Sequence, residues 1–599
     1  GTDLLRFVNH DKGNKHKRQA FMATSEPFDG FDMMGEVFDG HPTRAPIPEA
    51  VQRGECFNSL GKQPYAGLMA AVQFNAILKP GESKTWSIAF GSCPIDDARR
   101  DEFMHAVRRD VLADAKACRD ELDLIWQRKV TGYAIDTPDP VINRYFNVWS
   151  RYQNRGQTRF IGCLDRVGYR DILQNLLFMS DAEPLHARRM LIRTLHYQLP
   201  DGRAVRQYEK LPGCGHDARM YHDSSGWIAD TLAMYLKETG DVSICNEVVP
   251  FLDPKTLEVN QNDTATVYEH AARAVRYMSE QTGYHGLCRI GYGDWNDALS
   301  GIGGEQGVSV WLSCMCVYAA KQMADIAKVL GKSDDVKHFT QIANTLTQRI
   351  NEHAWDGKWY IYAINGKGEP IGSSDNAEGK IHLNVNTWAI FAGVAQAAGR
   401  EEQTWESIES LDTACGHKLL DPCYTARSRE GVGHIADQMP GLFENGSIYV
   451  HGEAFYLFAL AENDRTDRLY EQIFKTLPGA LVPDITTAPP HQQTNFFVGP
   501  DHEAFGCNFF TNFTGSVPWY RRTIAKVVGV ESDYDGLRIN PKPPTSWDQY
   551  RVTRSYRGAR VNLTFTRTGK RSLTVNTKPI EGDLIPAKEL KTGQSYEVA

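Results

Sequence analysis

The chain has 599 residues, of which 66 are Lys or Arg and 74 are Asp or Glu, so its formal net charge is −8. This charge gives no electrostatic argument for a nucleic-acid partner, and no run of about 18 apolar residues indicates a membrane-spanning helix. Hydrophobic residues make up 41% and charged residues 23%, as in ordinary soluble globular proteins. The length exceeds what one hydrophobic core usually fills, so we expect several domains.

The twelve cysteines are scattered along the chain, with no C-x-x-C pair and no zinc-type spacing. Some, such as Cys314 and Cys316, stand inside apolar segments with a helical period. We therefore expect reduced thiols in a cytoplasmic protein, and neither a metal ion nor an organic cofactor. The N-terminal stretch lacks the apolar region of a secretory signal, and because the chain starts at Gly1 without a Met, we expect a trimmed N-terminal domain.

The two ends of the chain differ in pattern from its middle. Residues 1–97 contain alternating stretches such as "AGLMAAVQFNAIL" and "KTWSIAFGSC", which predict part of an N-terminal β-sandwich. Residues 98–137 are charged with a helical period and predict a helical linker. Residues 530–599 return to strand alternation, as in "RVNLTFTRT", and predict a small C-terminal β domain.

Between these regions, residues 138–529 show one helical segment after another, joined by long loops rich in Gly and polar residues. The helical period recurs near 140–153, 171–181, 183–198, 225–238, 264–282, 308–330, 333–354, 386–399, 402–411, 445–462, 464–477 and 515–529. Loops of this length favour paired helices closed into an (α/α)6 toroid over a simple bundle. The predicted fold class is therefore mainly α with flanking β domains, and we expect function in the loops at one end of the toroid.

The loop "GYGDWNDALSGIGG" at 291–304 combines an aromatic ring with two carboxyl groups. Sugars stack their C–H faces on aromatic rings, and Trp295 between Asp294 and Asp297 offers such a platform beside an acid. A carboxyl group held against an indole in a partly dry pocket has a raised pKa, which suits a general acid. The alternative is that Asp297 or Ser300 caps the following helix while Trp295 belongs to the core.

A cluster of arginines stands in "NRGQTRFIGCLDRVGYRDILQN", at 154–175. Its charged residues are Arg155, Arg159, Asp165, Arg166, Arg170 and Asp171. Clustered guanidinium groups suit the bidentate capture of phosphate or of fixed hydroxyl pairs. Surface arginines remain the alternative, although the position of Arg170 and Asp171 at the opening of an apolar helix favours a functional role.

Two later stretches add further candidates. "PGLFENGSIYVHGEAF" carries Glu444 just before a helix and His451 about two turns later. Thr514 and Gly515 stand where the last helix before 530 begins, and backbone N–H groups with a hydroxyl there form an anion site. A satisfied core histidine and a plain N-cap threonine are the alternatives.

Together, these four stretches resemble glycoside hydrolase family 94, the inverting β-glucoside phosphorylases that act on cellobiose, cellobionic acid or chitobiose. The resemblance runs from about residue 140 to 530 and rests on four motifs in the same order. It implies an (α/α)6 catalytic domain, a homodimer, and inorganic phosphate as co-substrate with no further cofactor.

The resemblance also implies a role for each matching residue. Asp297 corresponds to the general acid. The residues that correspond to sugar-binding positions are Arg166, Arg170, Asp171, Trp295 and, in the acceptor site, Glu444. Those that correspond to phosphate-binding positions are Arg155, His451, Asn495, Thr514 and Gly515. Two positions depart from the pattern of the family. Phe443 stands where cellobiose phosphorylase has a Lys, and Asn495 stands where a Gln is expected.

This set of groups agrees with the chemistry of phosphorolysis. An inverting glycosidase needs one carboxyl group as acid and a second as base, about 6.5–9.5 Å apart, to activate water. Phosphate is already anionic, so a phosphorylase needs only the acid and a cradle of donors. We therefore predict inverting phosphorolysis of a β-linked gluco-disaccharide or oligosaccharide, cellobiose-like or cellobionate-like, to α-glucose 1-phosphate and the released sugar.

Two alternatives remain open at the level of the sequence. One is an inverting β-glucoside hydrolase on the same toroid, with Glu444, Glu453 or Glu503 as its base. The other is a non-catalytic glucan-binding module that keeps Trp295 and the arginines as binding groups.

Overall fold

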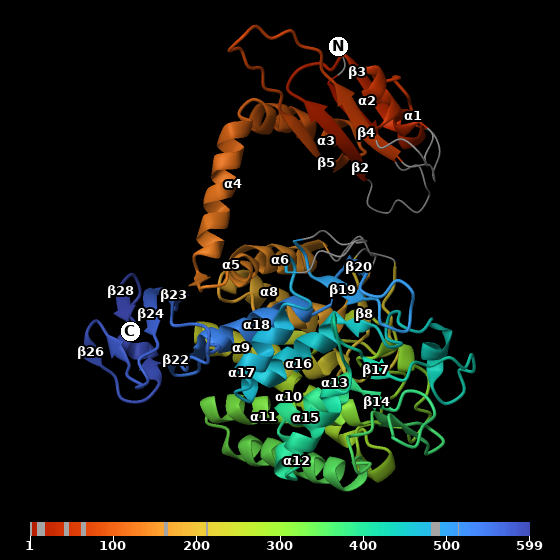
Figure 1. The fold of residues 1–599 in the computed structure, drawn as a ribbon, viewed down its shortest axis with the longest axis vertical. Helices are drawn as coiled ribbons and strands as arrows, with labels where there is room; N and C mark the ends of the chain where they lie inside the picture. Colours follow the sequence, from red (N-terminus) through yellow and green to blue (C-terminus); the bar gives the residue numbers. More distant parts are fainter. Residues whose placement is uncertain are drawn as a thin grey trace. The chain divides into compact units, whose positions relative to one another are not determined.

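The computed structural model describes residues 3–8, 18–40, 47–61, 68–160, 166–210, 214–480, 491–512 and 514–599. The chain divides into two compact units, 1–127 and 128–599 (Figure 1). All eleven cysteines in these ranges are free thiols. None of the helices in the described part of the chain combines the length and the apolar character needed to cross a membrane.

The smaller unit contains two antiparallel sheets and a group of helices. One sheet joins β1 (Leu4–Phe7), β2 (Arg18–Thr24) and β5 (Ile88–Pro94), and the other pairs β3 (Gly30–Met34) with β4 (Leu68–Gln73). Two short helices, α1 (Gly35–Asp39) and α2 (Glu49–Arg53), lie between β3 and β4 in the sequence. β4 and β5 fall within the two stretches that the alternation predicts as strands.

Side-chain alternation along β2 builds two small cores in this unit. Phe21 packs in one cluster with Met104 of α3 (Asp97–Ala106) and with η1 (Val107–Leu112). Met22, the next residue, packs on the other side with Leu5 and residues of β3 and β4. The sheet β1-β2-β5 therefore has helices on one face and the second sheet on the other.

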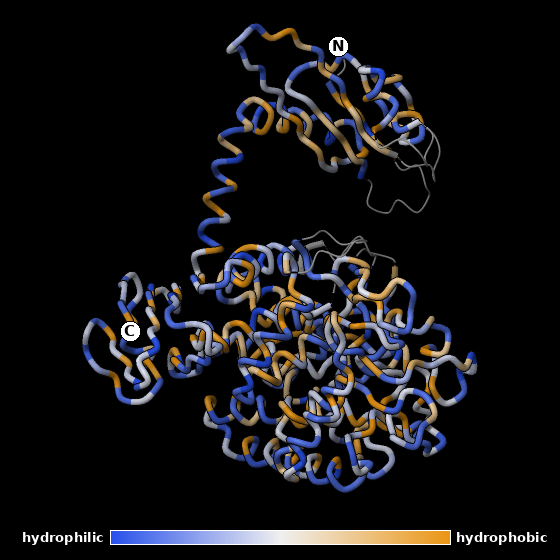
Figure 2. Tube along the Cα trace, in the orientation of Figure 1, coloured by the Kyte–Doolittle hydropathy of each residue, from blue (hydrophilic) through white to orange (hydrophobic). Residues whose placement is uncertain are grey.

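The predicted helical linker, 98–137, is only partly correct. After α3 and η1, α4 (Ala115–Val130) is helical and buries none of its residues, and blue and orange residues alternate along it in Figure 2. The end of the segment instead forms β6 (Tyr133–Asp136), which pairs with a strand of the C-terminal sheet. The alternating burial of Tyr133 and Ile135 suits this strand and not a helix.

The larger unit is mainly helical, as predicted. Its α-helices are α5 (Pro140–Arg144), α6 (Ser150–Phe160), α7 (Tyr169–Leu176), α8 (Pro184–Leu195), α9 (Trp227–Thr239), α10 (Val267–Glu280), α11 (Val310–Val329), α12 (Ser333–His353), α13 (Leu383–Phe391), α14 (Val394–Ala397), α15 (Glu401–Glu409), α16 (Val450–Glu462), α17 (Thr466–Ile473) and α18 (Ser516–Val528). Each predicted helical segment overlaps at least one of them. In Figure 2 the hydrophobic residues gather in the middle of this unit.

Six of these helices form the inner part of the unit. α7 contacts α9, α9 contacts α11, α11 contacts α13, α13 contacts α16, α16 contacts α18, and α18 contacts α7. α16 buries every residue from Val450 to Ala461, as expected for a helix that has neighbours all round. Aromatic rings fill the space between them, with Trp388 5.2 Å from Trp311 and 5.6 Å from Trp227 between ring centroids.

The C-terminal region is a β domain, as predicted from the alternation after residue 530. β21 (Val530–Asp533), β22 (Gly536–Ile539) and β27 (Leu584–Pro586) form one sheet. A second sheet has the order β26-β25-β28-β24-β23-β6, built around β23 (Gln549–Tyr556), β24 (Ala559–Thr566) and β28 (Ser595–Val598), with β25 (Thr574–Val575) and β26 (Lys578–Pro579) at one edge.

Candidate active site

A pocket of about 200 Å³ opens in the larger unit. Eight residues predicted from the sequence line it: Arg170, Asp171, Trp295, Asp297, Glu444, His451, Asn495 and Thr514. Six residues that were not predicted as site residues complete the lining: Gly168, Arg206, Gln207, Phe443, Tyr449 and Phe510. The pocket is smaller than the roughly 300–1,000 Å³ of drug-sized sites.

Short strand pairs between the helices bring these residues together. β7 (Arg166–Gly168) pairs with β8 (Gln207–Glu209), and the N–H of Tyr169 donates to the carbonyl of Arg206 at 3.0 Å. Arg170 and Arg206 therefore enter the pocket side by side. In the same way, β18 (Ile448–Tyr449) pairs with β19 (Thr494–Phe497), which aligns the start of α16 with Asn495.

Asp297 lies between these two arginines. Its Oδ2 is 2.7 Å from a terminal nitrogen of Arg206, and its Oδ1 is 3.2 Å from one of Arg170. The Asp297 side chain keeps 34% of its surface exposed, so it is accessible to a ligand in the pocket. It caps no helix: Asn296 caps the short turn η7 (Asp297–Leu299), and Ser309 caps α11.

Asp294 has a different environment, although it is only three residues away. It is fully buried and accepts hydrogen bonds from Ser309 Oγ at 2.6 Å, Tyr362 Oη at 2.8 Å and the Asn296 N–H at 2.9 Å. Burial raises the pKa of Asp294 to about 6, although these donors lower it. Asp294 thus holds the loop in shape, and Asp297 is the one of the two that faces the pocket.

Trp295 is held by a chain of buried hydrogen bonds. Its indole Nε1 donates to His451 Nδ1 at 3.1 Å, and His451 Nε2 lies 2.8 Å from Gln174 Oε1. Trp519 Nε1 also donates to Gln174 Oε1, at 3.0 Å. These partners assign the neutral tautomer of His451 with its proton on Nε2, in agreement with burial, which lowers the pKa of His451 well below its usual range.

Arg170 and Asp171 open α7, as the sequence predicts. Arg170 also pairs with the buried Asp223 at 3.0 Å and donates to the carbonyl of Asp294 at 3.0 Å. Burial raises the pKa of Asp171 to about 6, while Arg170 lowers it. The Asp171 carboxyl group packs onto Gly168, where an added Cβ would lie 1.8 Å from Oδ2, so any larger residue at 168 would displace the Asp171 carboxyl group.

Glu444 is half-buried in the tight turn at 441–446. Its Oε2 accepts a hydrogen bond from Gln438 Nε2 at 2.6 Å, and burial raises the pKa of this carboxyl group. Asn445 fixes the turn, because its side chain exchanges hydrogen bonds of 2.8 Å with both the N–H and the carbonyl of Tyr424.

Three predicted site residues do not line the pocket. Arg155, on α6, forms an ion pair with Glu183. Arg166 donates to the carbonyls of Cys214 at 2.7 Å and Gly215 at 2.8 Å. Gly515 is the N-cap residue of α18, directly after Thr514. The side chain of Arg159 lies outside the described part of the chain.

Arg206, which pairs with Asp297, was not predicted as a site residue, whereas Arg166, which was predicted, does not line the pocket. Arg206 stands in "DGRAVRQYEK", about forty residues after the arginine cluster, where its only sequence signal is the short alternation that precedes β8. Its guanidinium also lies over the ring of Tyr221, 4.7 Å from the centroid, and pairs with Asp217 at 3.2 Å.

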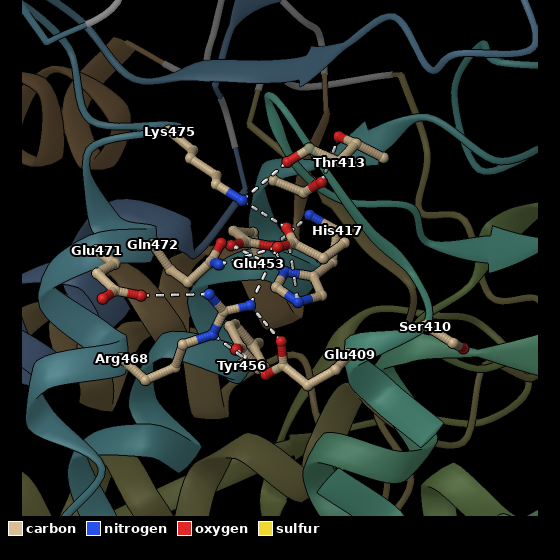
Figure 3. Close-up of polar contacts among 12 residues, drawn as sticks. Glu409, Ser410, Thr413, His417, Glu453, Tyr456, Arg468, Glu471, Gln472 and Lys475 are labelled. Atoms are coloured by element: carbon tan, nitrogen blue, oxygen red, sulfur yellow. Dashed lines mark hydrogen bonds and ion pairs between the residues drawn. The ribbon is translucent and has the colours of Figure 1, made fainter. Parts of the chain in front are cut away.

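A second polar cluster lies among α15, α16 and α17 (Figure 3). In the described ranges, Glu409, Asp412 and His417 form the one group of three side chains spaced for a metal ion. Arg468 and Lys475 already pair with its carboxylates, however, which makes it an ion-pair network. The buried Glu453 joins this network through His417, 3.2 Å away, and like Glu503 it does not line the pocket.

Comparisons with known proteins identify the family of the chain. The family model "Glycosyl hydrolase 94 superfamily, catalytic domain" matches residues 125–529. The chain is 31% identical to solabiose phosphorylase of Paenibacillus borealis, over 98% of this chain and 75% of that protein. It is 28% identical to 3-O-beta-D-glucopyranosyl-beta-D-glucuronide phosphorylase of the same organism (97% and 75%) and 27% identical to cellobionic acid phosphorylase of Neurospora crassa (100% and 75%).

A solved structure described as a sialidase is similar in fold alone. It is 12% identical to this chain, with a TM-score of 0.50, and the match covers 82% of this chain and 45% of that one.

Proposed function

Because the chain belongs to the glycosyl hydrolase 94 superfamily, we propose that it is an inverting glycoside phosphorylase. Its substrate is a β-linked gluco-disaccharide or oligosaccharide, and its products are α-glucose 1-phosphate and the released sugar. The observation that carries the proposal is the position of Asp297, a partly exposed carboxyl group beside Trp295 in a pocket whose lining also includes Asn495 and Thr514 as neutral donors.

In this mechanism Asp297 donates its proton to the glycosidic oxygen as the bond from that oxygen to C1 breaks. Phosphate attacks C1 from the opposite face and inverts the anomeric centre. Asp297 is then a carboxylate, which its ion pairs with Arg170 and Arg206 stabilise. The released sugar carries the transferred proton on its new hydroxyl group.

The proposed phosphate site consists of the Thr514 hydroxyl, the Asn495 amide and the N-terminus of α18 at Gly515, where the first N–H groups of the helix favour an anion. His451 lies next to this proposed site and is held in position by its hydrogen bond from Trp295. Arg155 belongs to the proposed site as well, but it binds phosphate only after it leaves Glu183.

The remaining residues provide the sugar subsites of the proposal. Trp295, Arg170 and Asp171 hold the glucosyl ring, and Glu444 binds the acceptor ring through its carboxyl group. Arg166, which contacts backbone carbonyls, supports this subsite indirectly.

We further propose that the ring of contacts through α7, α9, α11, α13, α16 and α18 is the inner layer of an (α/α)6 toroid over 138–529. The enzyme is proposed to be a cytoplasmic homodimer, and size-exclusion chromatography checks the dimer directly.

The test is a panel of β-linked disaccharides, cellobiose and cellobionate among them, incubated with and without inorganic phosphate. We expect α-glucose 1-phosphate only when phosphate is present. Glucose release without phosphate would instead identify a hydrolase, and Glu444 is the one of the three candidate bases that lines the pocket. Binding without any turnover would identify a glucan-binding module.

A further inference from the structure

Two phenylalanines at the pocket are unusually exposed for side chains of their size. Phe443 keeps 40% of its surface accessible and Phe510 keeps 47%, and both belong to the lining. The buried Phe496 supports both, since its ring centroid lies 5.0 Å from that of Phe443 and 6.3 Å from that of Phe510. Together, Phe443 and Phe510 form an apolar wall beside the turn that carries Glu444.

Both residues also have a backbone conformation that side chains rarely adopt. The φ angle is +48° at Phe443 and +58° at Phe510, where the Cβ atom clashes with the following carbonyl. Asn445 enforces the first through the 441–446 turn, and Thr494 Oγ1 enforces the second by donating to the Phe510 carbonyl at 2.9 Å. Such strain persists where the surroundings demand it, and it is concentrated at binding sites.

The charges of the lining point to the kind of acceptor that meets this wall. Its cations are Arg170 and Arg206, and each is already paired with aspartates. No lysine is among the described residues that line the pocket. Among the described lining residues, a carboxylated acceptor would therefore meet Glu444 and no uncommitted cation, which disfavours its binding.

We propose that Phe443 and Phe510 determine acceptor specificity, because the C–H face of a neutral acceptor sugar stacks on this wall while Glu444 binds its hydroxyl groups. This inference rests on the proposed phosphorolysis and adds its acceptor class: a neutral hexose unit in preference to a uronic or aldonic acid.

The experiment runs the reaction in reverse, with α-glucose 1-phosphate as donor and phosphate release as the signal. Glucose and galactose are compared with glucuronate and gluconate as acceptors. We expect at least a tenfold higher kcat/KM for the best neutral acceptor. Phe443→Ala and Phe510→Ala should each raise the KM for that acceptor about tenfold and change the KM for α-glucose 1-phosphate less than twofold.

Two further variants keep the test specific. Phe510→Tyr retains an aromatic face and should keep the wild-type KM for the acceptor, even if the alanine variants fold poorly. Phe505→Ala is the matched control, because Phe505 is similarly exposed, at 39%, and does not line the pocket. Its acceptor KM should not change.

Equal or better use of a carboxylated acceptor, or an unchanged acceptor KM in the two alanine variants, would overturn this inference and leave phosphorolysis intact. If the wild-type enzyme releases no phosphate with any acceptor and cleaves no disaccharide with phosphate, the proposed function itself fails.

Discussion

Asp294 and Asp297 have the same side chain and the same neighbour, Trp295, yet the structure gives them opposite surroundings. Three donors surround the carboxyl group of Asp294, whereas that of Asp297 meets two guanidinium groups and solvent. The sequence alone cannot distinguish them, because the donors come from Ser309 and Tyr362, which approach only when the chain has folded.

Asp297→Asn should lower kcat/KM for an unactivated disaccharide by about 10²- to 10⁴-fold, the usual contribution of a general acid, because an amide cannot donate the proton. Activity should recover on an aryl β-glucoside, whose leaving group needs little protonation. Steady-state kinetics on both substrates check this. Near-normal cleavage of the disaccharide would move the acid role to another residue.

Asp294→Asn should act on stability instead. The amide keeps one acceptor oxygen where the carboxylate accepts from three donors, so a donor is left unpaired in the core, at a cost of about 1–3 kcal/mol. Thermal unfolding of this variant and of Asp297→Asn, compared in the same buffer, should show the larger loss of melting temperature for Asp294→Asn.

Arg155→Ala tests whether the Arg155 guanidinium binds phosphate or only pairs with Glu183. If Arg155 exchanges Glu183 for phosphate, the KM for phosphate should rise by one to two orders of magnitude, equivalent to about 1.5–3 kcal/mol for hydrogen bonds to a charged group. The KM for the sugar should change much less. An unchanged KM for phosphate would assign Arg155 to its ion pair with Glu183 alone.

At the scale of the elements, α16 carries two buried polar residues, His451 and Glu453, that face different ways. His451 lies at the pocket, and Glu453, two residues later, lies in the network with His417 (Figure 3). Residues two positions apart point away from one another on a helix. The alternative role of Glu453 as a catalytic base therefore has no geometric support.

Glu453→Gln should weaken folding without removing activity. Glu453 Oε2 accepts the His417 N–H at 3.0 Å and lies 3.2 Å from His417 Nδ1, and loss of its charge should cost about 1–3 kcal/mol of stability. We expect a lower melting temperature and a kcat within a few-fold of wild type. A loss of kcat comparable to that of Asp297→Asn would restore the hydrolase alternative.

The helices were predictable because the 3.6-residue period extends over ten residues or more in most of them. The small strand pairs were not, since β7, β8 and β18 have two or three residues each, too few for an alternating pattern. These pairs bring Arg206 and Asn495 into the pocket. For this reason Asp297, Trp295 and Thr514, which stand in local motifs that resemble the family, could be predicted at the pocket, whereas Arg206, which pairs with Asp297, was missed.

At the scale of the whole molecule, the free energy of unfolding at acid pH depends on histidines that are buried in their neutral form. Burial lowers the pKa of His382 to about 3, with a smaller opposing effect of the Gly379 backbone, and it lowers that of His222 to about 4. In the unfolded chain a histidine titrates near pH 6.5. Between these values the unfolded chain binds protons that the folded chain does not, so the histidines disfavour the folded state as the pH falls below about 6.5.

His382→Leu should remove one of the protons that the unfolded chain binds and the folded chain does not. The wild-type protein should lose up to about 1.4 kcal/mol of unfolding free energy per pH unit through His382 between pH 6.5 and its folded pKa. Urea unfolding at several pH values from 7.5 to 4.5 gives the slope for both proteins. The variant should show the smaller slope, and parallel slopes would show that His382 is not buried in its neutral form.

The pairing of β6 with β23 has a consequence for how the chain can be divided. Residues 133–136 precede the catalytic helices, yet their strand partners are residues 551–554, and Tyr133 Oη donates to the Val530 carbonyl at 2.6 Å. The two ends of the catalytic region are thus closed by one sheet. A chain cut after Gly529 would leave β6 with an open row of backbone donors and acceptors, the kind of edge that pairs with a second molecule and leads to aggregation. The C-terminal domain is therefore a cover for the start of the catalytic region, and the two should be expressed, purified and engineered as one piece.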